Sequence, residues 1–169
     1  MITDLFKGMI SFVLLVLLQV LILNGIPFLG LAIGLPYIYF IIKLPVGMNR
    51  NWILLLGFAL GFVIDIFSNT PGVHAAATTF IAFSRRWIQG LFFSRDDFDQ
   101  EIPKLSLLRD AFVKYAIAMI LVHHSALILL ESFSYSNPLI MVAKILGSSV
   151  LSFVFIMGFE LVFNKKQKG

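Results

Sequence analysis

Long apolar runs separated by short polar segments dominate this sequence. A helix needs about 20 apolar residues to cross a hydrocarbon core of roughly 30 Å, and about 17 is the practical minimum. The runs that approach this length predict six membrane-spanning helices. They cover residues 9–26, 28–44, 52–67, 73–93, 111–130 and 138–163. The pattern therefore predicts an all-α, polytopic bundle in one transmembrane domain, residues 1–169.

Turn-forming residues mark several boundaries between these runs. Residues 68–72, Ser-Asn-Thr-Pro-Gly, separate the third span from the fourth. Pro138 suits the first turn of the sixth span, and Pro36 predicts either a kink in the second or the start of its regular part. The first two spans are also the pair that could form one re-entrant unit. A signal peptide is the rival interpretation of the first run, but no small-x-small cleavage site follows closely, so we expect an uncleaved helix.

Composition supports a membrane location. Hydrophobic residues make up 59% of the chain and charged residues 13%, whereas soluble domains have roughly 45–50% and about 25%. A soluble chain of this size would expose far larger apolar patches than soluble monomers tolerate. Cysteine is absent, which excludes disulfides, thiol nucleophiles and cysteine-based metal sites.

The basic residues predict the orientation in the membrane. With six spans, twelve of the 13 Lys and Arg residues fall on the side that carries both termini. They are Lys7, Lys43, Arg50, Arg85, Arg86, Arg95, Lys104, Arg109, Lys114, Lys165, Lys166 and Lys168. The positive-inside rule then places both termini in the cytoplasm. We therefore read the net charge of +4 as a sign of orientation and expect no nucleic-acid partner.

Asp65 is the most informative polar residue within the predicted spans. Gly57, Gly61 and Asp65 are four residues apart and share one helix face. Glycines at this spacing let a neighbouring helix approach closely. Because ionisable groups in lipid are costly, we expect Asp65 to face Lys144 or His74 inside the bundle. We favour a packing pair without chemistry, and Lys144 snorkelling outward is the other alternative.

The remaining polar residues predict no catalytic, cofactor or metal site. His123 and His124 are adjacent and point about 100° apart, so they cannot both ligate one metal from their helix. We expect one to form a hydrogen bond inside the bundle and the other to lie near an interface. Glu160 is expected to snorkel or to pair near the basic tail at residues 165–168. No phosphate-binding loop, nucleophile elbow or metal motif is present.

Residues 57–77, with Gly57, Gly61, Asp65, Gly72 and His74 at their characteristic positions, resemble the MreD family of rod shape-determining proteins. Shorter similar pieces lie along the rest of the chain: residues 18–24, Pro36-Tyr37-Ile38-Tyr39, Arg95-Asp96 and His123-His124. Ser94 departs from the family pattern, in which a proline precedes the Arg-Asp pair.

The resemblance implies a non-enzymatic, multi-pass component of the elongation machinery in the bacterial cytoplasmic membrane. Its implied partners are the MreC protein, the actin-like MreB filament, and the peptidoglycan glycosyltransferase and transpeptidase pair; homo-oligomerisation stays open. The bundle is expected to look like the substrate-binding subunits of energy-coupling-factor transporters. The small-residue faces Gly57/Gly61 and Ala75/Thr79 would either hold the bundle together or receive a partner's helix. The basic face would attract anionic membrane lipid, at about 1 kcal/mol per Lys or Arg.

Two rival functions stay open at the level of sequence. A substrate-capture subunit of a vitamin transporter would need a roomy pocket with polar lining among the outer helix ends. A small intramembrane enzyme would use Asp65 and the histidines.

Overall fold

The computed structural model describes residues 2–23, 32–94, 102–132 and 137–165, and this part of the chain is helical without a strand. Helix α1 (Ile2–Leu18) continues into a π-helical turn, η1 (Gln19–Leu23), and α2 (Ile38–Ile42) is short. Four long helices follow: α3 (Arg50–Ser68), α4 (Val73–Phe92), α5 (Leu105–Glu131) and α6 (Pro138–Lys165). These four occupy the positions of the third to sixth predicted spans.

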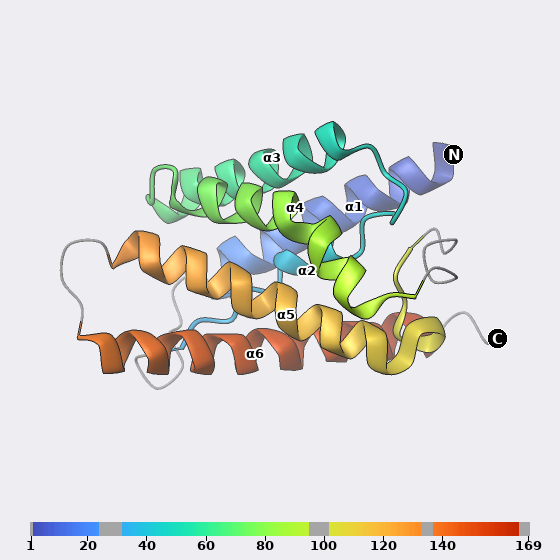
Figure 1. The fold of residues 1–169 in the computed structure, drawn as a ribbon. Coiled ribbons are helices and arrows are strands. Elements are labelled where there is room, and N and C mark those ends of the chain that lie inside the picture. The colour runs from blue at the N-terminus through green and yellow to red at the C-terminus, as the bar shows by residue number, and fades with distance from the viewer. Residues whose placement is uncertain (1, 24–31, 95–101, 133–136, 166–169) are drawn as a thin grey trace.

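The long helices pack in chain order. Helix α3 packs against α4, α4 against α5, and α5 against α6, while α1 crosses behind and α2 lies in the middle of the bundle (Figure 1). The start of α1, the end of α6 and the α2–α3 connection lie at one end (Figure 1, right). Lys43, Arg50 and Lys165 flank these elements, so we call this the basic end.

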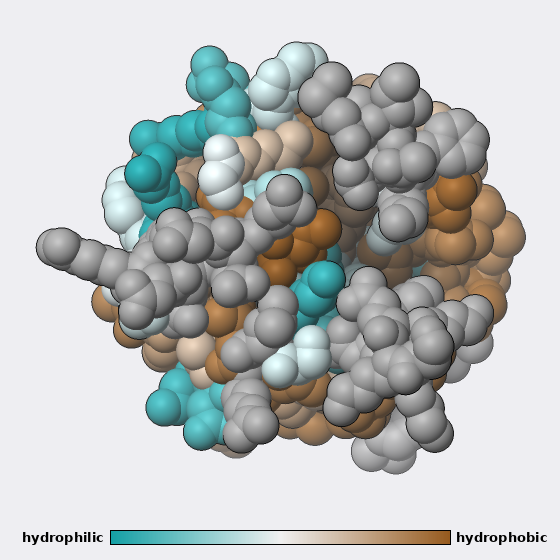
Figure 2. All heavy atoms as spheres, turned by 90° about the vertical axis from the view of Figure 1, so that its right-hand side faces the viewer, coloured by the Kyte–Doolittle hydropathy of each residue, from teal (hydrophilic) through white to brown (hydrophobic). Residues whose placement is uncertain are grey.

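In the described part of the chain, three helices are long and apolar enough to cross a membrane: α3, residues Asp110–Glu131 of α5, and residues Pro138–Val162 of α6. Residues Gly8–Leu23 form a shorter apolar helix. Large hydrophobic side chains are exposed along α1, α3, α4 and α6. The view onto the basic end shows hydrophilic groups there and brown, hydrophobic side chains around the sides (Figure 2). The protein is therefore a membrane protein, because water would not tolerate such a surface.

The second predicted span differs from the structure over its described part. Residues 32–37 are not helical, and α2 begins only after Pro36 and has five residues. Most side chains from 32 to 44 are buried; those of Tyr37 and Ile38 have no exposed surface. Hydropathy marks this segment as apolar but cannot tell a lipid-facing helix from a segment buried inside the protein. Residues 24–31, where the first and second predicted spans meet, lie outside the described residues.

Helices α3 and α4 form a tight antiparallel hairpin. Its turn has left-handed backbone at Asn69 (φ 55°) and Gly72 (φ 85°), a conformation that Asn and Gly adopt most easily. A Cβ atom at Gly61 would lie 2.5 Å from Ala75 Cα, and one at Gly57 would lie 2.8 Å from Ala82 Cβ. The Gly57/Gly61 face is therefore occupied by α4 and holds the bundle together.

Candidate functional site

Asp65 caps the start of α4. One carboxylate oxygen accepts hydrogen bonds from the Thr70 hydroxyl and the His74 N–H, both at 2.9 Å, and the other accepts from the Ala75 N–H at 2.8 Å. The first N–H groups of a helix have no partner within the helix, and a negative charge there is favourable. Gly72, the N-cap residue, has no side chain to supply such a cap. The carboxylate thus replaces a missing local cap, and it comes from the preceding helix.

These contacts distinguish the two partners predicted for Asp65, Lys144 and His74. Its link to His74 runs through the backbone N–H, not through the imidazole ring. Lys144 is absent from the described partners of Asp65. Lys144 is half-buried on α6, and its charge acts instead on Glu131, the last residue of α5. The Asp65–Lys144 pair is therefore not formed, and Asp65 has a structural role.

Tyr37 bridges two histidines in the core. Its hydroxyl lies 2.8 Å from His74 Nδ1 and 3.1 Å from His123 Nε2, and both imidazole rings pack edge-on against the phenol. A hydroxyl carries one proton, so Tyr37 donates to one ring and accepts from the other. His123 Nδ1 is buried without a hydrogen-bond partner. The non-helical segment is thereby tied to α4 and α5.

His124 belongs to a second chain of hydrogen bonds. Its Nδ1 lies 2.9 Å from the Ile120 carbonyl, which can only accept, so Nδ1 carries the proton. Nε2 then accepts from the Ser152 hydroxyl at 3.1 Å. The same hydroxyl oxygen accepts the Leu35 N–H at 2.8 Å. Contrary to the prediction that one histidine lies near an interface, His123 and His124 are both fully buried.

The serines of α6 thus satisfy the backbone of the non-helical segment. Besides the Leu35–Ser152 bond, the Ile33 N–H donates to Ser148 Oγ at 3.0 Å. Backbone groups at membrane depth must find partners inside the protein, and non-helical backbone is tolerated only where it is so buried. This explains why a serine pair faces the interior from the middle of a mostly apolar helix.

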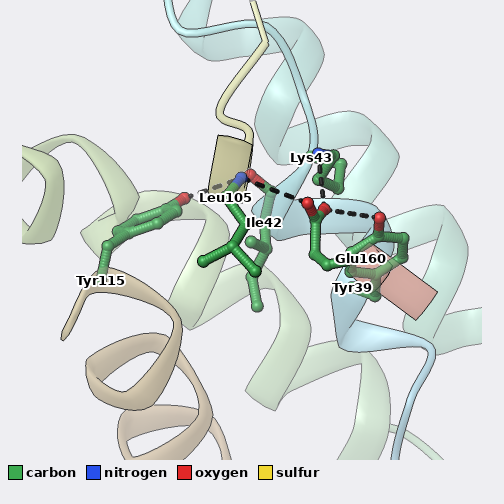
Figure 3. Close-up of polar contacts among 6 residues, drawn as sticks. All are labelled: Tyr39, Ile42, Lys43, Leu105, Tyr115 and Glu160. Carbon is green, nitrogen blue, oxygen red and sulfur yellow. Dashed lines mark hydrogen bonds and ion pairs between the residues drawn. The ribbon is translucent and has the colours of Figure 1, made fainter. Parts of the chain in front are cut away.

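At the basic end, Glu160 of α6 contacts Lys43, Tyr39 and Leu105 among the described residues (Figure 3). Lys43 Nζ lies 2.6 Å from Oε1, and the Tyr39 hydroxyl donates to the same oxygen at 2.7 Å. The Leu105 N–H, at the start of α5, donates to Oε2 at 3.2 Å. Glu160 is 1% exposed and forms a buried ion pair with Lys43; the tail side chains, with which a pairing was predicted, lie outside the described residues. One carboxylate thereby joins α6, α5 and the end of α2.

Arg85 is the buried polar residue that the sequence analysis missed, because there it counts only among the basic residues that predict orientation. It is 1% exposed, and its guanidinium donates to the carbonyl of Leu44, to that of Pro45 at 3.3 Å and to the Tyr115 hydroxyl at 3.1 Å. Tyr115 in turn lies 3.5 Å from the Ile42 carbonyl (Figure 3). The spacing of Arg85 from Thr78 and Ile81, seven and four residues earlier in α4, places all three on one helix face. This spacing was the available signal that Arg85 would be buried.

The second small-residue face of α4 has a different environment. Ala75 and Thr79 line an apolar groove of about 590 Å³ on the outside of the α3–α4 hairpin. We call it the external groove; its lining residues are Leu54, Phe58, Gly72, Ala75, Ala76, Thr79, Phe80 and Phe83. Gly57 and Gly61 pack internally, whereas the predicted Ala75/Thr79 face is divided: Ala75 is buried against Gly61, and half-buried Thr79 borders the open groove.

These hydrogen-bond networks mainly join helices and satisfy buried backbone groups. Within the described ranges, no three His, Cys, Asp or Glu side chains come together as a metal site would require. Buried side-chain atoms without a hydrogen-bond partner occur at Gln19, Gln89, His123 and Ser149. Comparison of the chain with profiles of protein families, with curated proteins and with solved structures finds no match.

Proposed function

We propose that this protein is a non-enzymatic scaffold of the bacterial cell-elongation complex, similar to MreD, with six passes through the cytoplasmic membrane, the second made by the buried segment that contains α2, and with both termini in the cytoplasm. Its role is to hold MreC and other elongation proteins through helix–helix contacts, and thereby to control cell shape and lateral peptidoglycan synthesis. The observation that carries the proposal is the use made of the motif in residues 57–77: Gly57, Gly61 and Asp65 build the α3–α4 hairpin. Motif residues that pack and cap helices, and do no chemistry, are what a scaffold needs.

The distribution of polarity supports the same proposal. Asp65, Glu160 and Arg85 bond inside the bundle, whereas the outer surface is apolar. In lipid, such a surface recognises other helices by van der Waals packing rather than by the hydrophobic effect.

We propose α6 as the main helix for partner contact. Only 22% of the apolar stretch of α6 is buried inside the protein, against 44% of the apolar stretch of α5. Among the long helices α6 packs against α5, at the edge of the row, and residues 33–35 cover its serine face, so only the remaining sides are available. Exposed apolar residues along it include Leu146, Val150 and Val154.

Disulfide cross-linking in the native cell tests this contact directly, because the chain has no cysteine of its own. Val150→Cys on α6 and Phe62→Cys on α3 are both exposed, at 64% and 50%, and form a matched pair. With a single cysteine in the transmembrane helix of MreC, we expect a cross-link to Val150→Cys and none to Phe62→Cys. Equal cross-linking of the two positions would show random collision and remove α6 as the contact.

Depletion of the protein in its native cell tests the function itself. Loss of regular, elongated shape is the expected result. Normal shape combined with a defect in vitamin uptake would overturn the scaffold and support substrate capture instead.

Substrate capture for an energy-coupling-factor vitamin transporter is the second candidate, and one observation favours it. Both amide atoms of Gln19, the Nδ1 atom of His123 and the Ser149 hydroxyl are buried without a partner. Gln19 also lies in a π-helical turn, a feature that is frequent at functional sites. A polar small molecule would supply partners for such atoms. Mass spectrometry of the purified protein tests this candidate: a small molecule that survives detergent extraction and is lost in Gln19→Leu would support it.

A further inference from the structure

The external groove is long enough for an acyl chain. It extends along α4 from Gly72, in the turn at the end opposite the basic end (Figure 1), to Phe83, eleven residues further on, or about 16 Å at 1.5 Å per residue. A chain from a lipid at the basic end reaches about 15 Å, half of a hydrocarbon core of roughly 30 Å, and would extend from Phe83 along most of the groove. Its volume of about 590 Å³ lies within the roughly 300–1,000 Å³ that is usual for ligand sites. Its lining is almost entirely apolar.

A cation stands at one end of the groove. The Arg50 guanidinium lies 4.4 Å from the centre of the Phe83 ring, which lines the groove, and 5.9 Å from that of Trp87. In the described part of the chain, the guanidinium contacts these two rings and no carboxylate. Stacking on two aromatic faces fixes the position of the charge beside the groove.

The position of Arg50 in its helix also favours an anion. Arg50 is the first residue of α3, where a positive charge is opposed by the helix dipole. Helix stability therefore does not account for the arginine. A phosphate at this place would meet the guanidinium and the positive end of the helix dipole together.

Aromatic residues place this cation at headgroup level. Trp52 and Trp87 are 59% and 60% exposed, and Arg86 is exposed next to Trp87. Tryptophan concentrates at membrane–water interfaces. Arg50 therefore lies where the headgroups of the leaflet at the basic end would be.

We propose that an anionic phospholipid binds here, with its phosphate at Arg50 and one acyl chain along the groove from Phe83 towards Gly72. An apolar groove with a fixed cation at one end matches an amphiphile with one anionic head. A partner's transmembrane helix would also cover the apolar part, but it would have to bring its own anion to Arg50. The proposal is independent of the scaffold function.

Native mass spectrometry of the full chain in detergent tests the headgroup contact. The probes are phosphatidylglycerol and phosphatidylcholine with identical palmitoyl and oleoyl chains. Arg50→Gln is expected to reduce the preference for phosphatidylglycerol about fivefold, which corresponds to one basic residue near a membrane surface. Lys114→Gln removes an exposed cation from α5 and should leave the preference unchanged. Equal losses in the two variants, or no loss in Arg50→Gln, would overturn the proposal.

A second pair of variants tests the acyl chain. Ala76 is exposed and lines the groove, whereas Ala143 is exposed on α6. Ala76→Leu should fill the groove and lower the retention of both lipids, while Ala143→Leu should not. Unchanged retention in Ala76→Leu would overturn the proposed place of the chain. If Ala76→Leu instead abolished co-purification of a membrane protein and left lipid retention intact, the groove would be a helix-docking surface.

Discussion

The Lys43–Glu160 ion pair gives the sharpest test of the energetics. Glu160 is 1% exposed and accepts from Lys43, from the Tyr39 hydroxyl and from the Leu105 N–H. Glu160→Gln keeps the size of the side chain and one acceptor oxygen but removes the charge. A hydrogen bond to a charged group contributes about 1.5–3 kcal/mol, and the Lys43 side chain is 21% exposed and keeps some water. We therefore expect a loss of about 2 kcal/mol in the free energy of unfolding.

For a chain of this size, about 1 kcal/mol shifts the melting temperature by about 2–4 °C. Glu160→Gln should then melt about 4–8 °C lower when unfolding is followed by circular dichroism in detergent. Glu131→Gln, at an exposed carboxylate on α5, is the matched control and should shift the midpoint by less than about 1 °C, because exposed ion pairs contribute little.

The double variant Lys43→Met with Glu160→Gln separates a lost pair from an uncompensated charge, because the glutamine keeps an acceptor for the Tyr39 hydroxyl or the Leu105 N–H. Removing one partner of a buried pair is costly because the other charge stays uncompensated, whereas replacing both partners is often neutral or stabilising. We expect the double variant to be more stable than Glu160→Gln. A double variant that melts lower than Glu160→Gln, or a Glu160→Gln midpoint equal to that of the unaltered protein, would refute this account of the ion pair.

Three further substitutions and one control, each followed by thermal unfolding, test the hairpin and the buried segment. Gly61→Ala should cost about 1–3 kcal/mol through overpacking against α4, whereas Gly90→Ala, where a Cβ would meet nothing within 4 Å, should stabilise α4 by about 0.5–1 kcal/mol; the same sign at both sites would contradict the close packing. Asp65→Ala should cost about 1–2 kcal/mol as a lost helix cap, and a change below about 0.5 kcal/mol would argue against capping. Ser152→Ala should cost about 1–3 kcal/mol, because the buried Leu35 N–H loses its partner; an unchanged midpoint would show that the bond is not needed.

Much of the architecture follows from local pattern. The apolar runs at 52–67, 111–130 and 138–163 coincide with α3, α5 and α6, because an uninterrupted apolar run of span length has few alternatives to a helix in lipid. The spacing of Gly57 and Gly61 also predicts a close helix contact, and α4 supplies it. The turn residues from 68 to 72 mark the hairpin for the same local reason: Asn and Gly tolerate left-handed backbone.

Partners that are distant in sequence were decided only by the tertiary structure. Spacing along one helix shows which face Asp65 occupies, but not that the N–H groups of His74 and Ala75 meet it there. Glu160 and Lys43 are more than a hundred residues apart, and no periodicity connects them. The apolar residues 32–44 read as a span because hydropathy measures only the preference to leave water, which burial inside the protein satisfies as well as lipid does. The sequence thus determined the helices and the membrane as their solvent, while packing determined which polar groups meet and which apolar segment is enclosed by protein.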